Sequence, residues 1–275
     1  MRQTIIIAGK EFRDGLRNRW IVAISLLLAL FSLSLAFLGA APTGAVNVDP
    51  LAVTIVSLSS LSVFLLPLIA LLLSYDAIVG DIDRGTMALL LAYPVTRWQV
   101  VLGKFVGHCL LLALSTVIGY GAAGLALQLT GGASPAAWQA FALLIASAVL
   151  MGAVFIAIGY LVSVLVRDRG TAGGIAIGVW LLFVLVYDMG LLAVLVADQG
   201  RMITGGVLNL LLLLNPADAF RLLNLAGTPG VASFSGLAGL AAQAHLGPPL
   251  LAVALALWVA VPLSAAMAVF SRRQI

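Results

Sequence analysis

Long uncharged, apolar runs dominate the chain, and most of them are long enough to cross a membrane as a helix, which takes about 20 residues. One uncharged stretch, from 105 to 166, is too long for a single crossing, but glycines and Pro135 interrupt it near 131–135. Proline is favoured at the first position of a helix, so a new helix is expected to begin there. The pattern predicts an all-α membrane protein with six transmembrane helices, over residues 20–41, 51–75, 105–130, 136–166, 171–197 and 249–270.

Basic residues predict the orientation of these helices. Of the 14 Lys and Arg residues, all but Arg201 and Arg221 fall on the side that holds both termini. Cytoplasmic loops are enriched in Lys and Arg, so both termini are expected in the cytoplasm. The first apolar run is longer than the apolar core of a cleaved signal peptide, about 7–15 residues, and is therefore expected to stay as a transmembrane helix.

The N-terminal segment, residues 1–19, is predicted to form an amphipathic helix that lies flat in the cytoplasmic interface and contacts membrane lipid. Ile5, Ala8, Phe12 and Leu16 recur at three- and four-residue spacing, and charged residues occupy other faces. The alternative is that this segment only provides a basic flank for the first transmembrane helix.

After the N-terminus, the most charged part of the chain is the predicted cytoplasmic loop, residues 76–104. Residues 86–92 should form a short helix, too small to cross the membrane, which Pro94 ends. Thr96 and Gln99 match a capping box for the helix that follows. A short helix held beneath the membrane would suit an external motor as a lever, whereas the alternative is an ordinary folded loop.

A long outer segment, residues 198–248, separates the last two predicted transmembrane helices. Loops of this length in compact proteins are often functional, which favours a binding role. Asn215 and Pro216 should end an apolar helix, and Asp218 and Arg221 could then pair with each other or face a partner. We expect short helices on the outer surface or beneath a partner protein.

Small residues at every fourth position mark helix faces that can approach closely. They are Gly103 with Gly107, and Gly170 with Gly174 and Gly178. Packing within one chain is the simpler interpretation, and a seam between two copies in a homodimer is the alternative.

The composition narrows the possible functions. Hydrophobic residues make up 63% of the chain and charged residues 9%, against about 25% charged residues in an average soluble protein. This excludes an ordinary soluble enzyme, a disordered protein and a nucleic-acid-binding domain. With one cysteine, Cys109, and two histidines, His108 and His245, the chain has no disulfide framework of its own and no multi-histidine metal site.

Motifs for chemistry are missing from the sequence. It contains no phosphate-binding loop, no nucleophile elbow and no zinc-protease motif, so we expect neither a catalytic nor a cofactor-binding site. His108 and Asp188 are the ionisable residues within the predicted spans. Asp188 lies near the end of its span, so we expect a structural or interfacial role for it. His108 and the adjacent Cys109 could supply only half of the ligands that a metal site needs. A membrane protein with so few buried charges should receive its energy from a partner.

The cytoplasmic loop resembles the signature of ABC-2 type transporter permeases, through Arg84-Gly85-Thr86, the run from Leu89 to Arg97, and Gly103-Lys104. In that family the segment forms a coupling helix that contacts a separate ATPase. The resemblance extends over the whole chain and implies a homodimer with two copies of a cytoplasmic ATPase, to which ATP and Mg²⁺ bind. It assigns ATPase coupling to Asp81, Asp83, Arg84, Gly85, Thr86, Leu90, Pro94, Thr96 and Arg97. Many members of the family carry Glu where this chain has Asp81 and Asp83.

Residues 92–100 and 214–224 resemble more narrowly the permeases of systems that mature the copper sites of nitrous oxide reductase. This implies a permease of the inner membrane that moves a copper or sulfur species, or does mechanical work on a periplasmic partner. The residues expected to contact that partner are Asn215, Pro216, Asp218 and Arg221. Two alternatives are an exporter of drugs or lipids from the same permease class, and a membrane anchor for a periplasmic protein that transports nothing.

Overall fold

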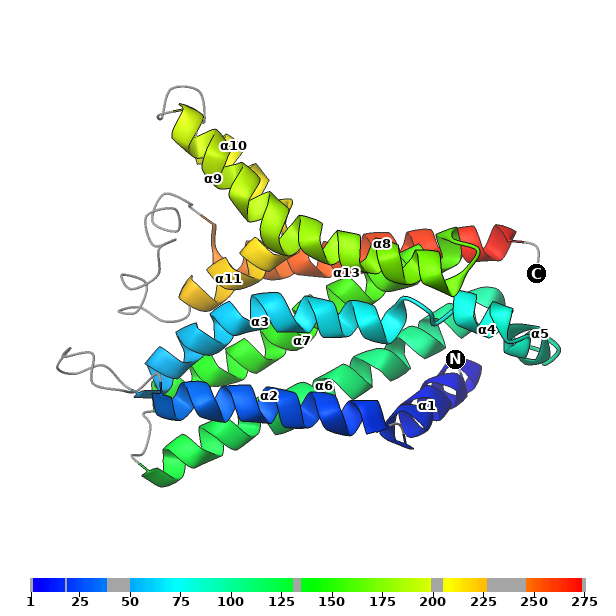
Figure 1. The fold of residues 1–275 in the computed structure, drawn as a ribbon, viewed down its shortest axis with the longest axis horizontal. Helices are drawn as coiled ribbons and strands as arrows, with labels where there is room; N and C mark the ends of the chain where they lie inside the picture. Colours follow the sequence, from blue (N-terminus) through cyan, green and yellow to red (C-terminus); the bar gives the residue numbers. More distant parts are fainter. Residues whose placement is uncertain are drawn as a thin grey trace.

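The computed structural model describes residues 2–17, 19–38, 50–130, 135–198, 205–226 and 246–273, and every regular element within these ranges is a helix (Figure 1). In chain order the helices are α1 (Arg2–Arg17), α2 (Arg19–Leu38), α3 (Pro50–Ser74), α4 (Val79–Asp83), α5 (Thr86–Leu91), α6 (Arg97–Thr130), α7 (Pro135–Leu165), α8 (Arg169–Leu181), the π-helix η1 (Leu182–Val186), α9 (Tyr187–Asp198), α10 (Gly205–Leu213), α11 (Pro216–Ala226) and α13 (Pro248–Arg272).

The predicted transmembrane segments coincide with α2, α3, α6, α7, the continuous run α8–η1–α9, and α13. Five segments in the described part of the chain are individually long and apolar enough to cross a membrane. Two further pairs pass the same test only jointly, α1 with α2 at a bend of 70° and α10 with α11 at a bend of 110°. The all-helical membrane class is therefore confirmed with five to seven candidate spans, and the count of six stays a prediction.

The long helices run side by side, with α7 packed against α3, α6, α11 and α13 (Figure 1). The large side chains of Phe141, Phe155 and Tyr160 on α7 are fully buried and form much of the core. The helix α1 lies at one end of the bundle against α6, and α4, α5 and the C-terminal end of α13 are at the same end (Figure 1).

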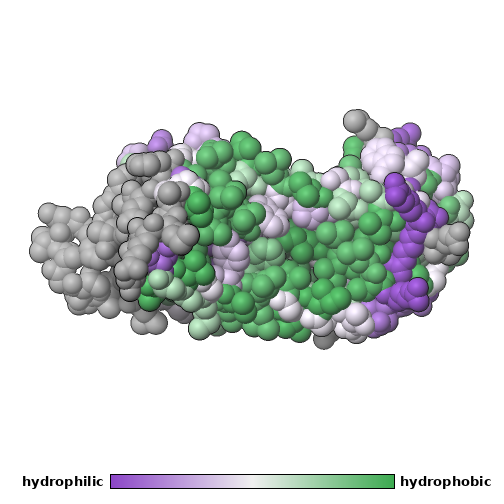
Figure 2. All heavy atoms as spheres, turned by 90° about the horizontal axis from the view of Figure 1, so that it is seen from above, coloured by the Kyte–Doolittle hydropathy of each residue, from purple (hydrophilic) through white to green (hydrophobic). Residues whose placement is uncertain are grey.

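The outer surface of the bundle is apolar, as a membrane protein requires. Figure 2 shows a broad hydrophobic surface over the middle of the molecule and a narrow hydrophilic band near one end. The run α8–η1–α9 stands out because only 6% of its most apolar window is buried within the chain. Beyond η1, α9 turns away from the bundle (Figure 1), so this run offers most of its surface to lipid or to another subunit.

The two predicted glycine faces differ in what they pack against. Gly103 and Gly107 lie against α1: an added Cβ at Gly103 would be 2.8 Å from the Ile7 Cβ, and one at Gly107 would be 2.7 Å from the Glu11 Cβ. In contrast, a Cβ added at Gly174 or at Gly178 would meet no atom of the described residues within 4 Å. The structure thus shows no packing partner for these two glycines within the described ranges, and the role of the Gly170–Gly174–Gly178 row stays a prediction.

The outer segment contains short helices, as predicted, but one of them does not lie on the surface. Chain direction changes sharply between α10 and α11 at Asn215 and Pro216, where the sequence predicted a helix end. Helix α11 packs against α3, α7 and α13, and its Phe220 is fully buried. The expectation of helices on the outer surface or beneath a partner is thus wrong for α11, because its apolar residues pack into the bundle of its own chain.

Candidate functional site

The candidate coupling segment consists of α4 and α5, between the end of α3 and the start of α6. The short helix predicted at 86–92 is confirmed as α5, with Ala92 as its C-terminal cap. Gly85 joins the two helices with a φ of 72°, a left-handed conformation that glycine adopts without steric cost. The Thr86 hydroxyl donates a hydrogen bond to the Asp81 carbonyl oxygen at 3.1 Å, which closes the turn between α4 and α5.

Two contacts fix the end of this segment. The Thr96 N–H donates to Gln99 Oε1 at 3.0 Å, which is the glutamine half of the predicted capping box. Gln3 Nε2 of α1 donates to the Pro94 carbonyl oxygen at 2.7 Å. Pro94 and Thr96 thus lie where the segment meets both α1 and the start of α6.

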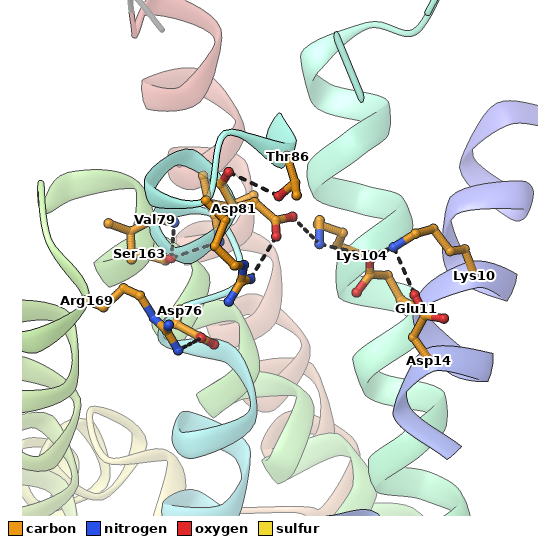
Figure 3. A network of polar contacts seen from close by, with 12 residues as sticks. Lys10, Glu11, Asp14, Asp76, Val79, Asp81, Thr86, Lys104, Ser163 and Arg169 are labelled. Atoms are coloured by element: carbon orange, nitrogen blue, oxygen red, sulfur yellow. Dashed lines mark hydrogen bonds and ion pairs between the residues drawn. The ribbon is translucent and has the colours of Figure 1, made fainter. Parts of the chain in front are cut away.

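Lys104 forms the centre of a polar network between α4 and α1 (Figure 3). Its ammonium group lies 2.8 Å from Glu11 Oε1 on α1 and 2.8 Å from Asp81 Oδ2 on α4, and its side chain is only 6% exposed. Asp81 also pairs with Arg84 at 2.9 Å. One buried cation therefore ties the N-terminal helix and the coupling segment to α6.

The electrostatics of Glu11 follow from this arrangement. Burial raises the pKa of Glu11, but the charge and the hydrogen bond of Lys104, assisted by Lys10 and His108, outweigh that effect and hold the pKa below its ordinary value. Glu11 is therefore an ionised partner of Lys104 in the folded protein.

The start of the coupling segment is bound to two further helices. Ser163 Oγ of α7 accepts hydrogen bonds from the backbone N–H groups of Ile78 and Val79, each at 3.0 Å. Arg169 of α8 pairs with Asp76 at 2.8 Å (Figure 3). A displacement of α4 would therefore be transmitted directly to α6, α7 and α8.

The exposed face of the segment differs from the predicted one. Leu89 is 70% exposed, and Tyr93, Asp83 and Arg84 are exposed as well. Leu90, which the resemblance assigned to ATPase coupling, is instead partly buried and packs against the core. Leu89 and Tyr93 are therefore the apolar side chains that this face offers to a partner, because α5 directs Leu90 toward the bundle.

At the outer end, the predicted partner residues form a buried cluster of their own. Arg221 lies 3.0 Å from Asp218 Oδ1 and 3.1 Å from Asp188 Oδ2 on α9. Asn215 donates to Asp218 at 3.0 Å and to the Phe183 carbonyl oxygen of η1 at 3.0 Å. Asn215, Pro216 and Asp218 are buried and Arg221 is mostly so. Contact with an outer partner stays a prediction, and exposed neighbours of these side chains would have to make it.

Comparison with known proteins gives the family. A family model described as ABC-2 family transporter protein matches residues 5–275. The chain belongs to the ABC-2 transporter family. It is also 48% identical over 275 residues to a protein of Stutzerimonas stutzeri described as "Probable ABC transporter permease protein NosY", with 99% of each chain covered. A protein of the same description from Pseudomonas aeruginosa is 47% identical over 271 residues, with 98% of each chain covered. The chain is thus an ABC transporter permease subunit.

In this permease, Arg97 links the coupling segment to the last helix. Its guanidinium group donates to the carbonyl oxygens of Phe270, at 3.0 Å, and of Arg273. Arg273 in turn donates to the Val164 carbonyl oxygen at the end of α7, at 3.0 Å. Arg97 therefore holds helix ends together, a role that its neighbours in the sequence did not indicate.

His108 belongs to the same polar region. Its Nδ1 lies 2.9 Å from the Tyr160 hydroxyl, and its Nε2 lies 3.9 Å from Glu11 Oε2. Within the described ranges, no three His, Cys, Asp or Glu side chains are grouped as metal ligands would be. Sequence reasoning did not identify Glu11, Ser163, Asp76 or Arg169 as part of this region. Lys104 could have indicated it, because a lone cation at the start of an apolar helix needs a counter-charge nearby.

Proposed function

We propose that the permease is the membrane subunit of an ATP-driven complex of the inner membrane that is required to assemble the copper sites of nitrous oxide reductase. The near full-length similarity to proteins described as NosY supports this, together with the resemblance of residues 92–100 and 214–224. In such a complex, ATP and Mg²⁺ bind to a separate NosF-like ATPase, present in two copies. A NosD-like periplasmic protein lies above the outer end.

The ATPase docks on the exposed face of α5 and the residues next to it. This face presents Leu89 and Tyr93 as apolar contacts, beside the charged side chains of Asp83 and Arg84. Full burial of a leucine contributes about 1.5–3 kcal/mol. The observation behind this assignment is that α5 is exposed on this face while its anchors are buried or paired. Lys104, Ser163 and Arg169 hold the adjoining α4 and the turn before it to three helices of the bundle. A rigid, well-anchored segment transmits a push from outside.

Two permease chains pair through the run α8–η1–α9. This run buries little of its apolar surface within its own chain, and its exposed Gly174 and Gly178 leave room for close approach of another helix. ATP-driven movement of two paired chains would then either carry a copper or sulfur species or do conformational work on the periplasmic partner.

The substitution Leu89→Asp tests the docking face. A carboxylate buried without a partner costs several kcal/mol, so binding of the ATPase should weaken at least about a hundredfold. The matched control is Leu129→Asp, because Leu129 is also exposed, at 88%, but lies at the other end of α6. Co-purification of the ATPase with both variants and with the unmodified permease measures the effect.

The expected result is loss of the ATPase from Leu89→Asp alone, with both variants inserted in the membrane at normal levels. Equal ATPase recovery from the two variants would show that α5 is not the docking face. A permease that never co-purifies with an ATPase would support the alternative of a membrane anchor without transport.

A further inference from the structure

The outward face of α1 is apolar and basic at once, and no other described part of the protein covers it. Ile5 is 71% exposed and Leu16 is 43% exposed, and Ile6 is exposed between them. These three side chains line a groove of about 890 Å³ together with Gly9, Arg13, Arg17 and the oppositely charged pair Lys10 and Asp14. A groove of this composition fits a molecule with an apolar body and an anionic group.

Some charged side chains of α1 form ion pairs and others do not. Lys10 pairs with Asp14 at 3.0 Å, and Lys104 of α6 lies 2.8 Å from Glu11, so both carboxylates of the helix already have partners. Arg13 and Arg17, one helical turn apart on the exposed side, form no ion pair within the described ranges. Two neighbouring guanidinium groups are therefore available to an anion from outside.

We propose that this groove binds an anionic phospholipid of the membrane leaflet on the α1 side, with its phosphate between Arg13 and Arg17 and its acyl chains along Ile5, Ile6 and Leu16. Guanidinium groups bind phosphate through paired, charge-assisted hydrogen bonds. The apolar side chains of the groove favour a lipid over a soluble phosphate. Helix α1 meets α2 at a bend of 70°, as expected of an interfacial helix beside the first span.

The bound lipid would act on the coupling segment through the buried side of the same helix. Close contacts at Gly103 and Gly107 fix that side of α1 against α6, and Glu11 joins it to Lys104 and Asp81. A lipid on the outward side stabilises α1 in the position that completes this network. Lipid binding itself is independent of the proposed function, whereas an effect of the lipid on ATP hydrolysis rests on it.

Lipid retention by the intact permease tests the site. The protein is purified in detergent, incubated with phosphatidylglycerol or phosphatidylcholine, and examined by native mass spectrometry. Each basic residue near an anionic membrane surface contributes about fivefold to binding, so the Arg13→Gln, Arg17→Gln double variant should bind phosphatidylglycerol about thirtyfold more weakly. The control with the same net charge is Arg167→Gln with Arg272→Gln, two exposed arginines outside the groove. A third variant, Arg13→Lys with Arg17→Lys, keeps both charges and should keep most of the binding.

The proposal requires that phosphatidylglycerol is retained in preference to phosphatidylcholine, and that inorganic phosphate does not displace it. Equal retention by the two double glutamine variants, or equal retention of both lipids, would overturn it. The ATPase provides a second readout, measured in nanodiscs of phosphatidylcholine alone and of equal parts of both lipids. If the glutamine substitutions at 13 and 17 release the ATPase in phosphatidylcholine alone, this face of α1 belongs to the ATPase and the lipid site is refuted.

Discussion

Replacement of Lys104 by methionine would remove the charge that joins α1, α4 and α6 while keeping a side chain of similar length. Its ammonium group is 2.8 Å from each of two carboxylates, Glu11 and Asp81, and the three side chains are 6%, 13% and 17% exposed. The substitution would leave the two carboxylates close together in a largely buried place. They would repel each other and lose their common partner.

The expected loss of stability is large. At an effective dielectric constant of about 20, each ion pair at 2.8 Å corresponds to roughly 6 kcal/mol of Coulomb attraction. Most of that attraction offsets the cost of burying the charges, and this cost remains when the lysine is gone. Loss of one partner from a buried ion pair costs about 3–5 kcal/mol, which corresponds to a decrease in Tm of roughly 6–20 °C for a chain of this size.

Thermal unfolding of the purified permease in detergent, followed by gel filtration, measures this loss. The matched control is Lys10→Met, since Lys10 also contacts Glu11 but is 62% exposed, and exposed pairs contribute about 0–1 kcal/mol. Adding Glu11→Gln to the Lys104→Met variant should restore part of the stability, because one unpaired carboxylate is removed. Equal Tm values for Lys104→Met and Lys10→Met would refute the central role of Lys104.

Three further predictions concern Glu11, the two glycine rows and the Arg221 cluster. The pKa of Glu11 in the folded state lies below its ordinary value of 4.5, so its ion pairs stabilise the fold above pH 4.5, and this stabilisation is lost as the pH falls through the lowered pKa. When the free energy of unfolding is measured against pH, acid should therefore reduce the stability of Glu11→Gln less than that of the unmodified protein. Gly107→Val should destabilise the permease by about 1–3 kcal/mol through its contact with α1. Gly174→Val should leave the unfolding temperature unchanged and, if two chains pair through α8 as proposed, shift gel filtration toward the single chain. Arg221→Glu should destabilise the fold by about 3–5 kcal/mol, since it would place a third carboxylate beside Asp218 and Asp188, and an unchanged Tm would contradict the pairing seen at the outer end.

The pattern of apolar residues predicted the helices well, because the formation of each helix depends mainly on the residues within it. The apolar runs became α2, α3, α6, α7, α8–η1–α9 and α13, with differences of a few residues at most ends. Helix α6 begins at Arg97, well before the apolar stretch at 105, because Gln99 caps the backbone at Thr96 and polar residues of its first turns have partners elsewhere. The short helix α5 was also predictable, from its length and from the proline that follows it.

The pattern did not predict which charged side chains are buried, because their partners lie far away in the sequence. Spacing along α1 suggested an apolar face through Ile5, Ala8 and Leu16, but the structure exposes Ile5 and Leu16 and places Glu11 inside. The reason is Lys104, a counter-charge 93 residues away in the sequence. Charged Asp218 and Arg221 suggested an exposed surface in the same way, whereas Asp188 of α9, 33 residues before Arg221, completes a buried cluster.

The requirement for this permease in copper-site assembly is tested by copper loading of nitrous oxide reductase in a denitrifying host whose own permease gene is replaced by the Leu89→Asp or the Leu129→Asp variant. The reductase is purified from the periplasm, and its copper content, its visible spectrum and its activity are measured. We predict that the reductase from Leu89→Asp cells accumulates without its copper–sulfide cluster. Leu129→Asp cells, altered at another exposed leucine at the far end of α6, should produce the loaded enzyme. Fully loaded, active reductase from Leu89→Asp cells would contradict the claim that ATP-driven coupling through α5 is required for maturation.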